Sequence, residues 1–243
     1  MMEYDWQPLL LSLRLASITT SLLLLIGVPL GYWLAFSHFR YKIFVEALVA
    51  MPLVLPPSVL GFYLLLALSP KNALGHFLDQ TFDLRLVFSF EGLVLASVLF
   101  SLPFMVHPVQ SGFQQLPRSL SEAAYTLGLS RWETLLRILL PNIKPSLLAG
   151  VVISFAHTIG EFGVVLMMGG SIPGVTKVAS IAIYDEVESL NYDAANFYAL
   201  ILFAISFAIL LTVFFLNRRA LRHFLCWNWR YKNSCTQRRE TSP

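Results

Sequence analysis

The chain has 243 residues, of which 56% are hydrophobic and only 13% are charged, and its mean hydropathy is +0.67. Soluble domains carry about 25% charged residues, so this composition excludes a secreted enzyme, a disordered chain and a disulfide scaffold and indicates a polytopic membrane protein. The formal net charge is only +3, so the placement of the 17 basic residues is more informative than their sum.

Five apolar runs are long enough for a membrane-spanning helix, which needs about 20 residues. They cover residues 9–36, 44–68, 93–109, 147–168 and 197–216, and the third is the shortest. The predicted fold class is therefore all-α, a polytopic membrane bundle of about five transmembrane helices per chain. We divide the chain into a transmembrane domain, residues 1–217, and a basic tail, residues 218–243.

Basic residues are concentrated on one side of these spans, which orients the chain because cytoplasmic loops carry an excess of Lys and Arg. Thirteen share that side: Arg40, Lys42, Arg118, Arg131, Arg137, Lys144, Arg218, Arg219, Arg222, Arg230, Lys232, Arg238 and Arg239. The other side holds Lys71, Arg85 and Lys177 together with nine carboxylates. The pattern predicts an external N-terminus and a cytoplasmic C-terminus.

The basic tail contains both cysteines, Cys226 and Cys235. Their wide spacing fits neither a redox pair nor a zinc knuckle, so we expect free thiols in a reducing compartment. Beside a final span, the basic residues would face anionic lipid headgroups rather than nucleic acid.

The second run contains a proline-rich segment, MPLVLPPS, at residues 51–58. Proline removes a backbone donor and clashes with the preceding turn, and a broken helix is tolerated in a membrane only beside protein or a wet cavity. Pro56, Pro57 and Ser58 therefore belong either to a translocation pathway or packed dimer face, or to a plain structural kink.

The loop after the third run, about residues 118–141, has a helical pattern on the cytoplasmic side. Ser119 or Ser121 can cap a first helix, with Glu122 in its first turn. Gly128 permits a turn, Ser130 can cap a second helix, and Pro141 would end it. We expect two short helices that project from the membrane.

The spacing in this loop resembles the EAA signature of the permease subunits of binding-protein-dependent ABC importers. The matching residues are Glu122, Ala123, Ala124, Gly128, Ile138, Leu140 and Pro141. The resemblance implies that Glu122 to Ser130, including Leu129, form a coupling helix that docks into a separate ATPase subunit.

Two further stretches resemble molybdate permeases: MPLVLPPSVLGFYLL from residue 51 and IGEFGV from residue 159. The second is also similar to sulfate/thiosulfate permeases. The short chain is more like the molybdate type, which implies a homodimer, than the sulfate type, in which two permeases differ.

No Gly-Lys pair occurs in the chain, so it lacks the phosphate loop that would bind a nucleotide. The permease itself is therefore expected to be no enzyme and to hold no cofactor. ATP would be bound by a cytoplasmic ABC ATPase dimer, and cargo would be delivered by an external or periplasmic substrate-binding protein.

Glu161 is the one carboxylate in the interior of a predicted span, since Glu46 lies at the edge of the second, and His157 lies one turn before it. Too few ligands converge there for a metal site, and a carboxylate binds an anionic cargo poorly. We interpret Glu161 as structural, near an outer gate, and consider Ser58 and Ser154 as hydroxyl ligands for an oxyanion. The predicted pathway or gate residues are Pro56, Pro57, Ser58, Ser154, His157, Gly160, Glu161 and Gly163.

The outer segment, residues 171–195, predicts a short amphipathic helix on the membrane surface. Such a helix could receive the binding protein or plug the outer end of the bundle.

The resemblance and the composition together favour an ATP-driven oxyanion importer in the bacterial inner membrane, and they favour molybdate as the transported oxyanion. Tungstate and sulfate/thiosulfate remain alternatives. A secondary transporter is a second class of function, but no inverted repeat is seen among the five spans.

Overall fold

The computed structural model describes residues 5–37, 39–212 and 215, and every regular element within them is helical. The helices are α1 (Gln7–Phe36), α2 (Lys42–Val54), α3 (Pro57–Leu68), α4 (Ala73–Phe82), α5 (Phe90–Gln114), α6 (Arg118–Thr126), α7 (Arg131–Thr134), the π-helical η1 (Leu135–Leu139), α8 (Leu140–Asn142), α9 (Lys144–Gly160), α10 (Gly163–Gly169), α11 (Ala179–Glu188) and a last helix, Tyr192–Thr212. The all-α membrane fold is confirmed, while the basic tail, residues 218–243, lies outside the described residues.

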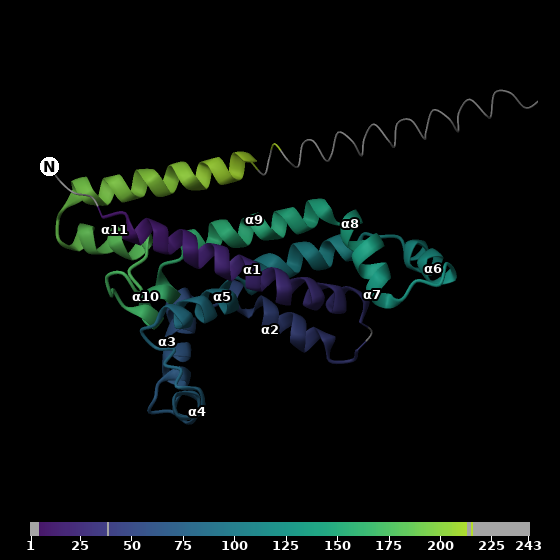
Figure 1. Cartoon of the computed structure of the whole chain (residues 1–243), viewed down its shortest axis with the longest axis horizontal. Helices are drawn as coiled ribbons and strands as arrows, with labels where there is room; N and C mark the ends of the chain where they lie inside the picture. The colour runs from purple at the N-terminus through teal and green to yellow at the C-terminus, as the bar shows by residue number, and fades with distance from the viewer. Residues whose placement is uncertain (1–4, 38, 213–214, 216–243) are drawn as a thin grey trace, which may run out of the picture.

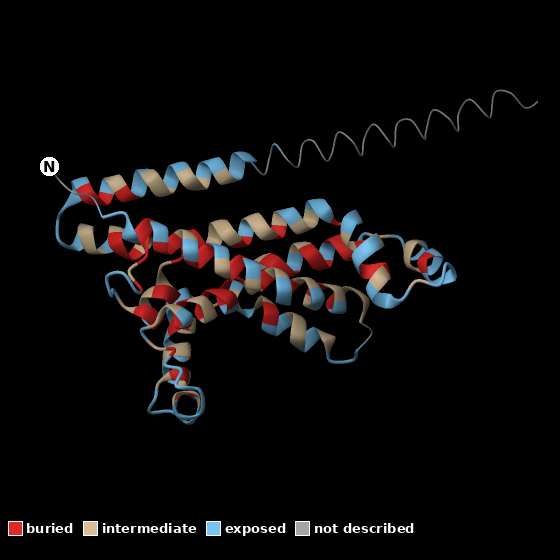
Figure 2. Cartoon of the chain, in the orientation of Figure 1, coloured by how far each residue is buried: buried red, intermediate tan, exposed pale blue. Residues whose placement is uncertain are grey.

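Helices α1, α5 and α9 pack side by side and form the centre of the molecule (Figure 1). Two glycines of α1 allow α5 to approach closely: a Cβ atom on Gly31 would lie 2.9 Å from Val109, and one on Gly27 would lie 2.6 Å from Met105. Larger residues at these positions would force the helices apart. Helix α5, predicted as the shortest span, is the most deeply buried of the long apolar helices (Figure 2).

The number of spans agrees with the prediction only if bent helix pairs are counted. Three helices in the described part of the chain are long and apolar enough to cross a membrane, and two further pairs of helices are each bent at a short break. The second predicted span, residues 44–68, is one of these, because the chain bends by 114° between α2 and α3. The bend lies at Leu55 and Pro56, which are extended, and Pro57 begins α3. Proline at this break explains why the run is not one straight helix.

The fourth predicted span, residues 147–168, is also interrupted. Helix α9 ends at Gly160, Glu161 is extended, and α10 begins at Gly163. Helix α10 packs mainly against α3 and α5. The spanning element in this region is therefore α9, and α10 fills the corner that the α2–α3 bend leaves.

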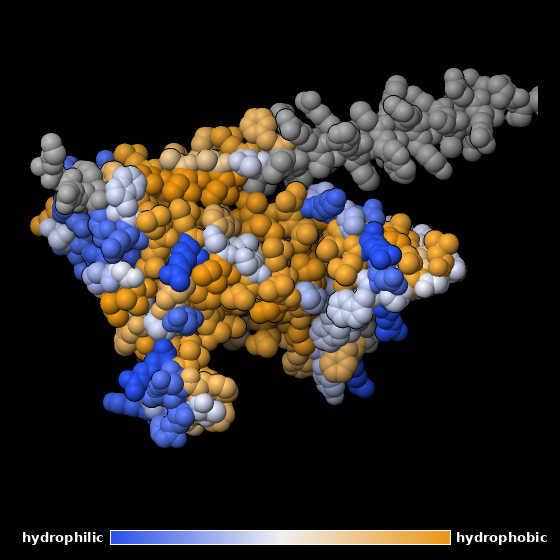
Figure 3. Space-filling model, in the orientation of Figure 1, coloured by the Kyte–Doolittle hydropathy of each residue, from blue (hydrophilic) through white to orange (hydrophobic). Residues whose placement is uncertain are grey.

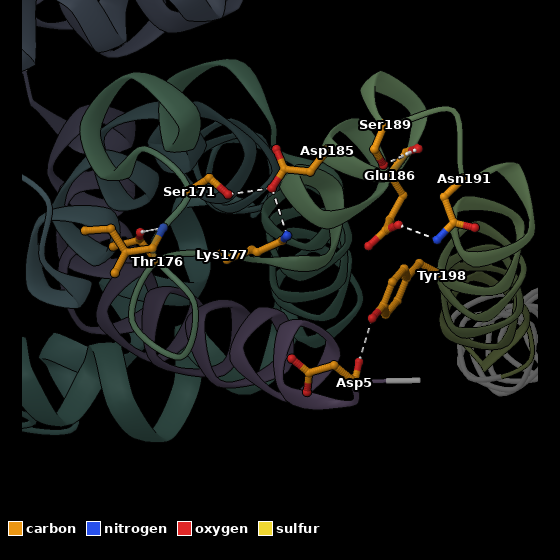
Figure 4. A network of polar contacts seen from close by, with 10 residues as sticks. Asp5, Ser171, Thr176, Lys177, Asp185, Glu186, Ser189, Asn191 and Tyr198 are labelled. Atoms are coloured by element: carbon orange, nitrogen blue, oxygen red, sulfur yellow. Dashed lines mark hydrogen bonds and ion pairs between the residues drawn. The ribbon is translucent and has the colours of Figure 1, made fainter. Parts of the chain in front are cut away.

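The outer segment contains the expected short helix, α11, and one face of it packs against the bundle. Ala179, Ile181 and Ala182 of α11 are buried, and the Ala179 amide donates a 2.8 Å hydrogen bond to the buried Ser12 hydroxyl of α1. Polar contacts also connect α11 to its neighbours (Figure 4): Asp185 contacts Ser171 and Lys177 at 2.6 and 2.9 Å. Helix α11 thus closes one end of the bundle, which is the plugging role considered above.

Candidate functional site

The predicted coupling loop forms a helical hairpin at the end of the molecule opposite α11 (Figure 1). Its first helix, α6, begins at Arg118 with Pro117 at the N-cap. The expected caps, Ser119 and Ser121, therefore lie inside the helix, and Glu122 is in its second turn. Proline at this boundary restricts the preceding backbone and starts the helix two residues earlier than the serine pattern suggested.

Gly128 makes the turn between the two helices. Its φ is +79°, in the left-handed region that residues with a Cβ atom disfavour. The amides of Gly128 and Leu129 donate to the carbonyls of Tyr125 and Ala124, at 3.0 and 3.1 Å, and close the end of α6. No atom lies within 4 Å of a Cβ built on Gly128, so glycine is needed here for backbone conformation rather than for space.

Ser130 caps the second helix, as predicted, and forms a full capping box with Glu133. The Ser130 hydroxyl accepts the Glu133 amide at 3.3 Å, and the Glu133 carboxylate accepts the Ser130 amide at 3.0 Å. These hydrogen bonds, from the Ser130 backbone first and its hydroxyl second, hold the pKa of Glu133 below its ordinary value. The carboxylate half of the capping box is therefore intact at neutral pH and weakens only as pH falls through that lowered pKa.

We expect a Ser130→Ala variant to weaken the start of α7, because loss of a serine cap costs about 1 kcal/mol. Amide hydrogen exchange in residues 131–134 should accelerate about fivefold, which is the equivalent of that free energy. Ser119→Ala is the matched control, since Ser119 is exposed and forms no side-chain hydrogen bond in the described structure. Equal exchange in both variants would show that the capping box does not stabilise the hairpin.

The second arm of the hairpin is anchored in the bundle. Leu135, Leu139 and Ile143 are buried in a cluster that also contains Met105 and Phe113 of α5. Pro141 was predicted to end this arm, but the helical path continues to Asn142 and then bends by 79° into α9. A displacement of the hairpin is therefore transmitted to α9 through a packed joint.

The tip of the hairpin exposes large apolar side chains. Leu127 is 78% exposed and Trp132 is 69% exposed, and Tyr125 and Leu136 are also on the surface. In Figure 3 apolar and charged surfaces meet at this end of the molecule. Exposed apolar groups surrounded by charges are typical of a protein interface. The predicted Glu122 and Ala123 are exposed beside them, Ala124 is buried, and Leu129 and Ile138 are half-buried.

Sequence reasoning did not select Tyr125, Leu127 or Trp132 as site residues. The available signal was three large apolar residues within eight positions of a loop otherwise predicted to face water.

Four predicted pathway residues come together at the α2–α3 corner. Pro56, Pro57 and Ser58 are exposed, and a Cβ on Gly163 would lie 2.9 Å from Pro57. Gly163 thus serves packing within the chain. Gly160 is exposed, and nothing lies within 4 Å of a Cβ built on it.

The other predicted pathway residues belong to a polar seam between α5 and α9. The Ser101 hydroxyl lies 3.0 Å from His157 Nδ1 and 3.2 Å from the Thr158 hydroxyl. His157 is half-buried and stacks on Phe104 with ring centroids 4.1 Å apart. The Thr158 hydroxyl donates to the Ser154 carbonyl at 2.9 Å.

Ser154 and Glu161 are buried, and neither the Ser154 hydroxyl nor either Glu161 carboxyl oxygen has a hydrogen-bond partner in the described part of the chain. No group of three or more His, Cys, Asp or Glu residues there could hold a metal ion. In this conformation Ser154 and Glu161 face the protein interior rather than an open pathway.

Comparison with known proteins gives matches over most of the chain. Residues 27–223 match the family described as binding-protein-dependent transport system inner membrane component. The molybdenum transport system permease protein ModB of Azotobacter vinelandii is 43% identical over 87% of this chain and 94% of its own length. The putative molybdenum transport system permease protein YvgM of Bacillus subtilis (strain 168) is 32% identical over 87% and 92%. The sulfate transport system permease protein CysT of Escherichia coli (strain K12) is 32% identical over 79% of this chain and 69% of its own length.

Solved structures share the fold at low sequence identity. A chain of the MetNI methionine ABC transporter, in an inward-facing conformation, is 17% identical, with a TM-score of 0.67 over 87% of this chain and 93% of that one. A chain of a bacterial alginate ABC transporter, in complex with an alginate-bound periplasmic protein, is 19% identical, with a TM-score of 0.73 over 90% and 80%.

Proposed function

The chain belongs to the family of binding-protein-dependent transport system inner membrane components, and from this premise we propose that it is the permease of an ATP-driven importer for molybdate. Relatives named for molybdenum transport match this chain over 81–94% of their own length, whereas those named for sulfate transport match over 69–72%. Tungstate, which has the same tetrahedral shape and charge, is the nearest competing cargo.

The cargo is tested by reconstituting this permease with its ATPase and binding protein in proteoliposomes. Labelled molybdate should accumulate only with ATP, and excess tungstate should compete far more effectively than excess sulfate. ATP-dependent accumulation of sulfate, unaffected by molybdate, would instead assign the permease to the sulfate type.

The hairpin of α6 and α7 is proposed as the surface that docks the ATPase. This proposal is supported by the exposed apolar tip around Leu127 together with the buried base of the hairpin at Leu135 and Leu139. The tip can be covered by a partner, while the base passes its movement to α9 and α5. ATP-driven closure of the partner would then rock the bundle between its two access states.

The importer is proposed to contain two copies of this chain. Exposed apolar residues line α2 and the start of α3, including Phe44, Leu48, Val54 and Phe62, so a second copy or lipid must cover them. Two copies related by a two-fold axis would present one hairpin to each half of an ATPase dimer. Pathway roles for Ser58 and Gly160, which are both exposed in the single chain, depend on that second copy.

The hairpin end is proposed to face the cytoplasm, because the connection from α1 to α2, which contains Arg40 and Lys42 in the sequence, lies at the same end as α6 and α7 with their basic residues (Figure 1). The opposite end, with α11 and Asp5, would face outward and receive the binding protein. We therefore expect Cys226 and Cys235, which lie outside the described residues, to resist a membrane-impermeant thiol reagent added to intact cells. A cysteine at exposed Leu190, beside α11, should be labelled in the same cells. Protection of Leu190→Cys with labelling of the native cysteines would reverse the orientation.

A further inference from the structure

A cavity of about 890 Å³ lies between the end of α1 and the inner side of the hairpin. Five elements contribute to it: the last turns of α1, the end of α5, helices α6 and α7, and the start of η1. Leu127, at the exposed tip, is not among its lining residues. Tyr125 and Trp132, at the edge of the tip, do line it, so the cavity lies on the inner side of the hairpin, next to the surface that we assign to the ATPase.

One part of the lining is basic. Arg118 and Arg131 line the cavity with a single carboxylate, Glu122, so its formal charge is positive. The ion pairs found in the described residues join other partners, and neither arginine is in one. Tyr32 and Tyr125 line the same cavity. Guanidinium groups beside phenol hydroxyls are suited to a phosphate group.

The other part of the lining is aromatic and reaches into the membrane-spanning helix. The rings of Tyr32 and Phe113 are in edge contact with centroids 5.5 Å apart, and Phe36 lies 6.1 Å from Phe113. Lining residues extend from Pro29 to Ser37, which corresponds to about 12 Å along α1. An α1 of 30 residues is about 45 Å long and exceeds the hydrocarbon core of about 30 Å, so this end lies at headgroup depth.

We propose that this cavity binds an anionic phospholipid of the surrounding membrane. The phosphate lies between Arg118 and Arg131, and an acyl chain follows Trp33 and Phe36 along α1. Basic pockets beside spans, with aromatic groups at the interface, favour this class of ligand. The bound lipid connects the hairpin to α1. The buried side chains at the base of the second arm, Leu135 and Leu139, connect the hairpin to α5 in the same way. The proposal needs the hairpin to lie at the membrane surface, but it does not depend on which cargo is carried.

The test measures lipid retained by the purified complex of permease and ATPase. The complex is exchanged into detergent with equal amounts of phosphatidylglycerol and phosphatidylcholine, and bound lipid is counted by native mass spectrometry. Wild type should retain phosphatidylglycerol preferentially. An Arg118→Gln/Arg131→Gln double variant should lose about thirtyfold of that preference, about fivefold for each charge removed. Arg137→Gln is the matched control, because Arg137 belongs to the same hairpin but does not line the cavity.

Any of the following results would overturn the proposal. Wild type could retain both lipids equally, the double variant could keep the wild-type preference, or inorganic phosphate at millimolar concentration could displace the lipid and identify a site for free anions. Lipid retention is measured without transport, so its result does not depend on which cargo the importer carries. The double variant must still bind the ATPase as wild type does, and joint loss of ATPase and lipid would assign the cavity to the ATPase.

Discussion

A Gly128→Val variant is expected to reach the membrane but to lose ATPase binding and transport. The backbone at Gly128 has a φ of +79°, and a left-handed conformation costs a residue with a Cβ atom about 1–2 kcal/mol, with more for a β-branched side chain. The turn can avoid that cost by opening, and the amides of Gly128 and Leu129 then leave the carbonyls at the end of α6. Since the tip is formed by this turn, the docking surface loses its shape. Co-purification with the ATPase and ATP-dependent uptake measure the effect.

Gly128→Asn is the control for this experiment. Asparagine also adds a Cβ atom, but it tolerates the left-handed region, and no atom lies within 4 Å of that Cβ position. We therefore expect Gly128→Asn to keep most of the activity. If valine and asparagine were equally harmful, bulk at the interface would be the cause, and if valine were harmless, the turn would not belong to the coupling element.

A Leu127→Asp variant should weaken ATPase binding about thirtyfold or more. Burying a leucine side chain contributes about 2 kcal/mol, and a carboxylate in the same contact must also be desolvated. Leu127 is 78% exposed and ends α6 with a backbone that aspartate can adopt, so the fold of the permease should be unaffected. The affinity of the solubilised permease for its purified ATPase is the quantity to measure.

Two controls define the Leu127 result. Leu127→Met keeps an apolar side chain of similar volume and should bind nearly as wild type does. Leu190→Asp places the same charge on a residue that is 71% exposed at the opposite end of the bundle and should have no effect on ATPase binding. Equal binding by Leu127→Asp and wild type would remove the hairpin tip from the interface.

Most of the fold could be predicted from the sequence because a membrane allows few architectures. Long apolar runs identified α1, α5 and the last helix, and the Gly128 turn and the Ser130 cap followed from local chemistry. The bends could not be predicted as well. The prolines indicated a kink near Pro56, but hydropathy counts apolar residues without regard to direction, so it showed neither the size of that bend nor the break at Glu161.

The candidate site was also only partly predictable. The spacing of Glu122, Gly128 and Pro141 located the hairpin, but spacing does not show which side chains remain uncovered. The exposure of Leu127 and the cavity beneath the hairpin depend on how α6 and α7 lie against α1 and α5. Similarly, the sequence did not show that Ser154 is buried or that Gly163 packs closely against Pro57.

In our proposal, this chain is the membrane subunit of an importer and couples through its hairpin to a separate ATPase. The most direct measurement is the mass and composition of the importer purified from membranes by a tag on this chain. We predict a complex with two copies of this chain and two ATPase subunits, and Leu127→Asp should yield the permease without the ATPase. A wild-type permease that purifies without any ATPase, and still transports its cargo, would contradict the account.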